Sequence, residues 1–117
     1  MNKYTICCSE EQTHKALNLG APIKKAETRY DLYNERYFFI DDEDKATIIP
    51  TAEEMIGWLE EKIYHIVVVK NKNGTWFYMI YCENSLIHEI KSDYTTRKEA
   101  TLAAIDAALE YLENLNR

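Results

Sequence analysis

Apolar and polar positions repeat with two different periods along this chain, and the change of period separates helices from strands. A helical spacing of apolar residues predicts helices over residues 52–62 and 97–114. These two segments and a shorter one, residues 10–19, each open with a hydroxyl residue followed three positions later by Glu or Gln. This is the capping-box pattern of a helix start, so we expect three helices.

The segment between the last two helices has the two-residue period and the β-branched, aromatic composition of strands. An antiparallel meander is predicted over residues 64–91, with turns at Asn71–Gly74 and at residues 83–85. A shorter hairpin is predicted over residues 36–49, around the acidic turn Asp41–Asp44. The fold class is therefore α+β, with helices 52–62 and 97–114 packed on one face of the meander. All 117 residues are expected to form a single domain.

Composition excludes a disordered or linker-like chain, because 46% of the residues are hydrophobic and only 3 Gly and 2 Pro are present. The 3 Cys are expected to be reduced thiols, since a chain of this length can be stable without disulfides. The longest uncharged run, Asn73 to Cys82, is far shorter than the roughly 20 residues that span a bilayer. No signal-peptide core is found near the N-terminus. We expect no membrane segment and a cytoplasmic location.

The charge balance argues against duplex nucleic acid as a partner. Asp and Glu number 20 and Lys and Arg 14, which gives a net charge of -6, and the deficit is spread along the chain. Proteins that bind duplexes usually present a basic patch, because phosphate neutralisation supplies much of their affinity.

Residues with catalytic or metal-binding potential are present but lack the required spacing. Cys7, Cys8 and His14 do not form the paired motif of a tetrahedral metal site. Asp41–Asp44 lacks the closing Glu of a calcium loop, and Cys82 has no His beside it in sequence to activate its thiol. No Gly-rich phosphate loop or nucleophile elbow occurs. The sequence predicts no enzyme, no metal and no cofactor.

The strand predicted over residues 75–82 is apolar on both sides. Its alternate residues divide into Trp76, Tyr78 and Ile80 on one side and Phe77, Met79 and Tyr81 on the other. Helices that pack on an antiparallel sheet commonly cover one face and leave the other polar. A second covering layer is therefore needed here. It is either the N-terminal segment of the same chain or a partner.

The partner alternative defines a candidate interaction face for self-association as a homodimer, or for an unknown protein partner. Glu83 and Glu89 are expected near strand ends, at the rim of this face. The face comprises Val67, Val69, Phe77, Met79 and Tyr81.

A different function follows if the other side of the strand is exposed. Aromatic side chains on a sheet can stack bases, so the alternative is a protein that binds single-stranded nucleic acid. Its expected contacts are Trp76, Tyr78, Lys70, Lys72, Lys91, Arg97 and Lys98.

Three stretches carry a resemblance to a family: Leu19–Pro22, Ile49–Leu59 and Tyr94–Ala100 with the helix that follows it. Together they resemble small uncharacterised proteins of prophages and mobile elements in gut bacteria. The resemblance implies no activity, but it implies a phage or mobile-element setting for a non-enzymatic interaction or accessory protein. Residues 64–112 also resemble the β-β-β-α arm-binding domain of phage-type integrases, although the basic sheet face of those domains is missing here.

Overall fold

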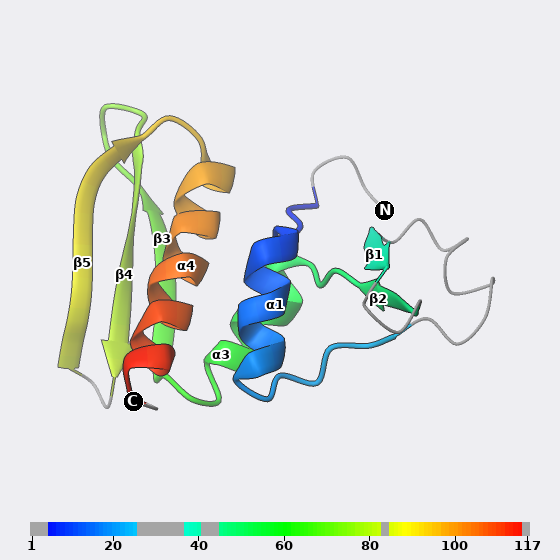
Figure 1. Cartoon of the computed structure of the whole chain (residues 1–117). Coiled ribbons are helices and arrows are strands. Elements are labelled where there is room, and N and C mark those ends of the chain that lie inside the picture. Colours follow the sequence, from blue (N-terminus) through cyan, green and yellow to red (C-terminus); the bar gives the residue numbers. More distant parts are fainter. Residues whose placement is uncertain (1–4, 26–36, 41–44, 83–84, 116–117) are drawn as a thin grey trace. The chain divides into compact units, whose positions relative to one another are not determined.

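The computed structural model describes residues 5–25, 37–40, 45–82 and 85–115. Its residues form two compact units, 1–54 and 55–117. The mixture of helices and antiparallel strands confirms the α+β class (Figure 1). The elements in chain order are α1 (Glu10–Asn18), β1 (Phe38–Ile40), β2 (Ala46–Ile48), α3 (Ala52–Leu59), β3 (His65–Lys70), β4 (Trp76–Cys82), β5 (Ser85–Tyr94) and α4 (Arg97–Leu115).

Helix α1 begins and ends where the sequence predicts. The Gln12 N–H donates to Ser9 Oγ at 3.0 Å, and the Ser9 N–H donates to Gln12 Oε1 at 3.0 Å, which completes the capping box. The helix ends at Asn18 with Leu19 as its C-cap, and Gly20 follows with a φ of 92°. Glycine adopts this left-handed conformation without the steric cost that a Cβ would add.

The first unit also holds the predicted short hairpin. Strands β1 and β2 pair antiparallel, with Phe39 opposite Thr47. The Phe39 ring lies 4.5 Å from the ring of His14 in α1, measured between centroids, and so connects hairpin and helix. The acidic turn Asp41–Asp44 lies outside the described residues.

Helix α3 is preceded by a second capping box. The Glu54 N–H donates to Thr51 Oγ1 at 3.1 Å, and the Thr51 N–H donates to Glu54 Oε1 at 3.0 Å. The N-terminal segment runs beside this cap, because the Cys8 N–H donates to the carbonyl of Pro50 at 3.1 Å. Residues of α3 fall in both units.

The second unit is built on the predicted meander, an antiparallel sheet of order β3-β4-β5. At the first turn the Asn71 N–H donates to the carbonyl of Thr75 at 2.7 Å, and Gly74 has a φ of 91°. The third strand is longer than predicted, since it continues from Lys91 to Tyr94. Its pairing with β4 has two register shifts, one between Ile80 and Tyr81 and one between Trp76 and Tyr78. Beyond the second shift, Trp76 pairs with Tyr94.

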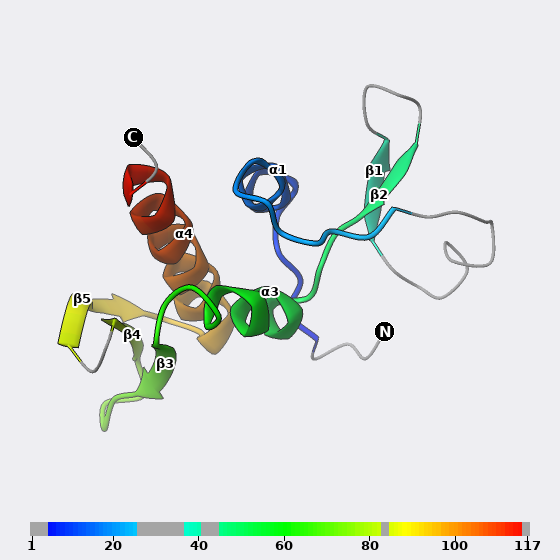
Figure 2. The ribbon, with the colours of Figure 1, turned by 90° about the horizontal axis from the view of Figure 1, so that it is seen from below.

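Helix α4 packs on one face of this sheet and contacts all three strands (Figures 1 and 2). Ile105 and Leu109 of α4 are fully buried, as are Tyr78 and Ile80 of β4. Burying each such side chain stabilises the unit by roughly 1.5–3 kcal/mol. The predicted packing of the last helix on one sheet face is confirmed.

Candidate interaction face

The register of the sheet brings the five predicted face residues together. Val67 pairs with Met79 and Val69 with Phe77, while Tyr81 pairs with His65. Residues directly opposite each other in an antiparallel pair share one face. The five residues Val67, Val69, Phe77, Met79 and Tyr81 therefore lie on the same face, which we call the open face.

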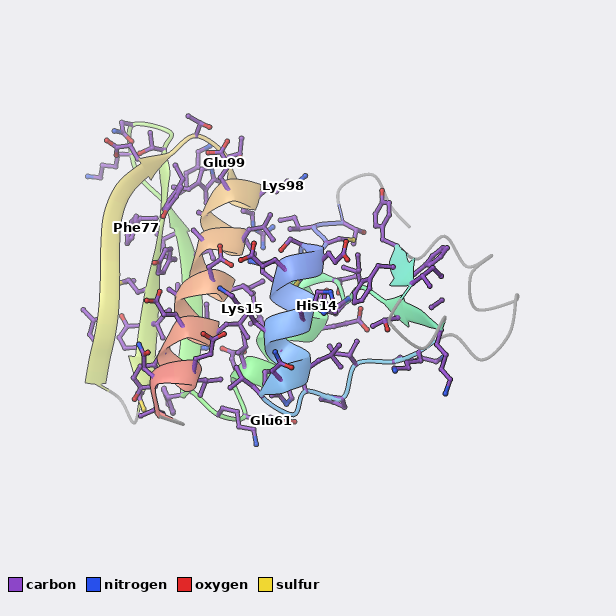
Figure 3. The ribbon with its side chains drawn as sticks, in the orientation of Figure 1. His14, Lys15, Glu61, Phe77, Lys98 and Glu99 are labelled. Carbon is purple, nitrogen blue, oxygen red and sulfur yellow. The ribbon has the colours of Figure 1, made fainter. Side chains whose placement is uncertain are left out.

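The open face is turned away from α4. Tyr78 and Ile80, which alternate with its members along β4, are each only 1% exposed on the helix side. All five open-face residues are instead half-buried. Within this face, the Tyr81 hydroxyl donates to Met79 Sδ at 3.5 Å. Phe77, another member of the face, can be found by its label in Figure 3. A contiguous group of apolar side chains that stays in contact with water is typical of a surface that binds another molecule.

Two further residues, His65 and Leu86, belong to this face but were not predicted from the sequence. His65 pairs with Tyr81 on one side, and Leu86 pairs with Tyr81 on the other. Leu86 is 47% exposed. His65 lies two residues before Val67 on β3, so the alternation of side chains along a strand is enough to predict that it shares their face. Leu86 could not be placed in this way, because the register shifts between Ile80 and Tyr81.

The expected acidic rim is wrong for Glu89. Strand β5 runs from Ser85 to Tyr94, so Glu89 lies in the middle of the strand, directly opposite Met79. Glu83 lies outside the described residues. Glu89 therefore cannot form the rim at a strand end that the sequence predicts.

The alternative nucleic-acid site is contradicted at Tyr78. This side chain is 1% exposed beneath α4, so its ring cannot stack on a base. Burial, with further contributions from Tyr94, Asp106 and Glu110, raises the pKa of Tyr78 well above its usual value.

The other members of that site are partly accessible. Trp76 is half-buried, and Lys70 Nζ lies 5.9 Å from its ring centroid. Lys72, Arg97 and Lys98 are exposed, whereas the Lys91 side chain lies outside the described part of the structure. Without Tyr78, the aromatic platform is reduced to one partly covered ring.

The described titratable groups form local contacts. His65 Nδ1 bonds to Glu60 Oε2, which also accepts the Ile66 N–H at 3.0 Å. The Tyr111 hydroxyl lies 3.9 Å from Cys82 Sγ and joins α4 to β4. Among the described residues, no cluster of His, Cys, Asp and Glu could hold a metal ion.

Comparison of the chain with family models, curated proteins and solved structures yields no match. The resemblance to prophage proteins thus stays a prediction. Within the part of the chain that the structure describes, no helix is long and apolar enough to cross a membrane.

Proposed function

We propose that this protein acts by binding another protein chain without catalysing a reaction, and that it does so through the open face. The observation that carries the proposal is the different burial of the two sides of β4. Ile80 is covered by α4 and 1% exposed, whereas its neighbours Met79 and Tyr81 are only half-buried, as are three other apolar side chains on their face.

The partner that fits this face is a second copy of the chain. Each Å² of apolar surface removed from water contributes about 25 cal/mol, so two identical apolar faces stabilise each other by pairing. A twofold axis is the commonest way in which identical surfaces close on one another, and sheets pack face to face about 10 Å apart. A stable pairing should bury more than roughly 1,000 Å² in total.

The phage or mobile-element setting remains a prediction that belongs to this proposal. An accessory protein in such a setting needs a binding surface and no catalytic machinery. Single-strand nucleic-acid binding is less well supported, because it depends on Tyr78, which is 1% exposed.

The experiment is to measure the molar mass of the protein in solution by sedimentation, with and without Tyr81→Glu. We expect the wild type to be larger than one 13.8 kDa chain and the variant to have half the mass of the wild type. A carboxylate at Tyr81 would be desolvated without a partner, which is strongly unfavourable. The matched control is Tyr37→Glu, the same change at a residue that is 62% exposed in the other unit, and it should not alter the mass.

A second variant covers the case in which Tyr81→Glu unfolds the chain. Met79→Lys keeps an unbranched side chain of similar length and places a charge at the centre of the same face. Folding of both variants is checked by circular dichroism. A wild type of 13.8 kDa at high micromolar concentration would overturn the proposal, as would a folded Met79→Lys variant with unchanged mass.

A further inference from the structure

The free edge of β3 is a second surface on which the chain can associate. In the order β3-β4-β5, strand β3 has a neighbour on one side only among the described residues. The other edge strand carries Glu89, Lys91 and Asp93, and charges of this kind protect an edge from pairing. Residues 66–69 of β3 are Ile-Val-Val-Val and contain no charge.

The hydrogen bond at the turn determines which backbone groups of β3 point outward. The Asn71 N–H donates to the carbonyl of Thr75, so the backbone polar groups of Asn71 point towards β4. In an antiparallel pair this direction alternates along the strand, so the backbone groups of Val69 and Val67 also point towards β4. The backbone groups of Ile66, Val68 and Lys70 therefore point away from β4, to the free edge. The bond from the Ile66 N–H to Glu60 confirms this assignment, because Glu60 is not part of the sheet.

Glu60 occupies the first of these outward positions. Its Oε2 accepts the Ile66 N–H at 3.0 Å, so an added strand cannot bond there without displacing the carboxylate. The next outward positions are Val68 and Lys70, and both lie beyond the reach of that contact. The edge thus offers a short pairing segment with one end already capped.

We propose that β3 pairs antiparallel with β3 of a second copy, with Val69 on the twofold axis. In this register Val68 of each copy lies opposite Lys70 of the other, and the two residues exchange N–H···O=C bonds in both directions. Placing Val68 on the axis instead would set Ile66 opposite Lys70 and would require the N–H that Glu60 already holds. Glu60 therefore selects the register.

Charge favours the same arrangement. The carboxylate of Glu60 stands at one end of the β3 edge, and Lys70 and Lys72 stand at the other end, both exposed. An antiparallel twofold brings the basic end of each copy alongside Glu60 of its partner. Glu61 and Lys62, also exposed near the acidic end, carry opposite charges and largely offset each other.

Edge pairing would also enlarge the apolar area of the open face. Because β3 lies at the centre of the joined sheet, the apolar side chains of β3 and β4 from both copies form one patch. This inference goes beyond the proposed function, since it concerns a different surface. If both surfaces operate, two edge-paired dimers stack through their open faces into a closed tetramer.

The test uses Val68→Pro in the full chain. Proline removes the outward N–H donor at Val68 without removing a bond to β4, and Val68→Thr is the matched control that keeps the donor and the β-branched shape. We expect Val68→Pro to halve the molar mass measured by sedimentation and Val68→Thr to leave it unchanged. A folded Val68→Pro variant with the wild-type mass would overturn the inference.

A charge variant tests the register independently of proline. Lys72→Glu places two carboxylates together across the axis and should weaken association severalfold, with a smaller effect as salt screens the repulsion. Lys98→Glu makes the same charge change at an exposed residue of α4 and should have no effect. Equal effects of the two variants would count against the Val69-centred register.

The two proposals fail in different ways. If only the open face associates, the wild type is a dimer, Tyr81→Glu is a monomer and Val68→Pro remains a dimer. If only the β3 edge associates, the wild type is a dimer, Val68→Pro is a monomer and Tyr81→Glu remains a dimer. If both surfaces associate, each variant halves the mass of a tetramer and the double variant is a 13.8 kDa monomer.

Discussion

Glu60 and Ile66 are joined by a hydrogen bond of 3.0 Å from the Ile66 N–H to Glu60 Oε2. The same oxygen bonds to His65 Nδ1, so one carboxylate connects the turn after α3 to the first residues of β3. An edge strand exposes N–H groups along its free side, and here a side chain of the same chain satisfies one of them. The contact both anchors the sheet and limits where a further strand can pair.

Replacement of Glu60 by Ala should lower the free energy of unfolding by about 1 kcal/mol, because a hydrogen bond to a charged acceptor is lost at a partly exposed site. Glu60→Gln keeps an acceptor oxygen for the Ile66 N–H and should cost less. Urea unfolding of the wild type and both variants measures the difference. Equal stabilities of Glu60→Ala and wild type would show that the bond contributes nothing.

Helix starts could be predicted from sequence because each capping box is a local interaction. The boxes at Ser9 and Thr51 form completely. At the third start, the Glu99 N–H donates to Thr96 Oγ1, but the Glu99 carboxylate accepts the hydroxyl of Thr95. The pattern placed the helix correctly even where a neighbouring residue replaced one partner.

The identity of the covered sheet face could not be predicted in the same way. Both sides of β4 are apolar, so periodicity assigns Tyr78 and Met79 to opposite faces without saying which face meets α4. Tyr78 was consequently a candidate for base stacking, and the structure buries it. The position of Glu89 was missed because the length of β5 depends on pairing beyond a register shift that leaves no local signal.

The difference between the two faces predicts different costs for shortening adjacent residues of β4. Ile80→Ala should lower the free energy of unfolding by about 2–5 kcal/mol, because Ile80 is 1% exposed and its loss leaves a cavity under α4. Met79→Ala should cost roughly 1 kcal/mol at low protein concentration, since Met79 is half-buried on the open face. Chemical denaturation compares the two, and a larger loss for Met79 would contradict the assignment of the faces.

Two glycines should respond to alanine with opposite signs. Gly74→Ala should destabilise the chain by about 1 kcal/mol, because its φ of 91° disfavours a Cβ. Gly57 lies within α3 and has nothing within 4 Å of an added Cβ, so Gly57→Ala should stabilise by about 0.5–1 kcal/mol. Thermal unfolding of the pair gives the answer. A stabilising Gly74→Ala would mean that the turn has another conformation.

Stability at high pH should depend on Tyr78. Burial raises the pKa of this phenol above its usual value of 10.0, so the folded protein holds the proton more tightly than the unfolded chain does. The resulting stabilisation is full below about pH 10 and is lost as the pH rises above it, by up to about 1.4 kcal/mol per pH unit. Tyr78→Phe removes this ionisation and should flatten the decline, whereas Tyr37→Phe, at a 62% exposed residue, should not. Urea unfolding between pH 8 and about pH 11 distinguishes these outcomes, and an unchanged slope in Tyr78→Phe would show that the buried phenol does not govern stability at high pH.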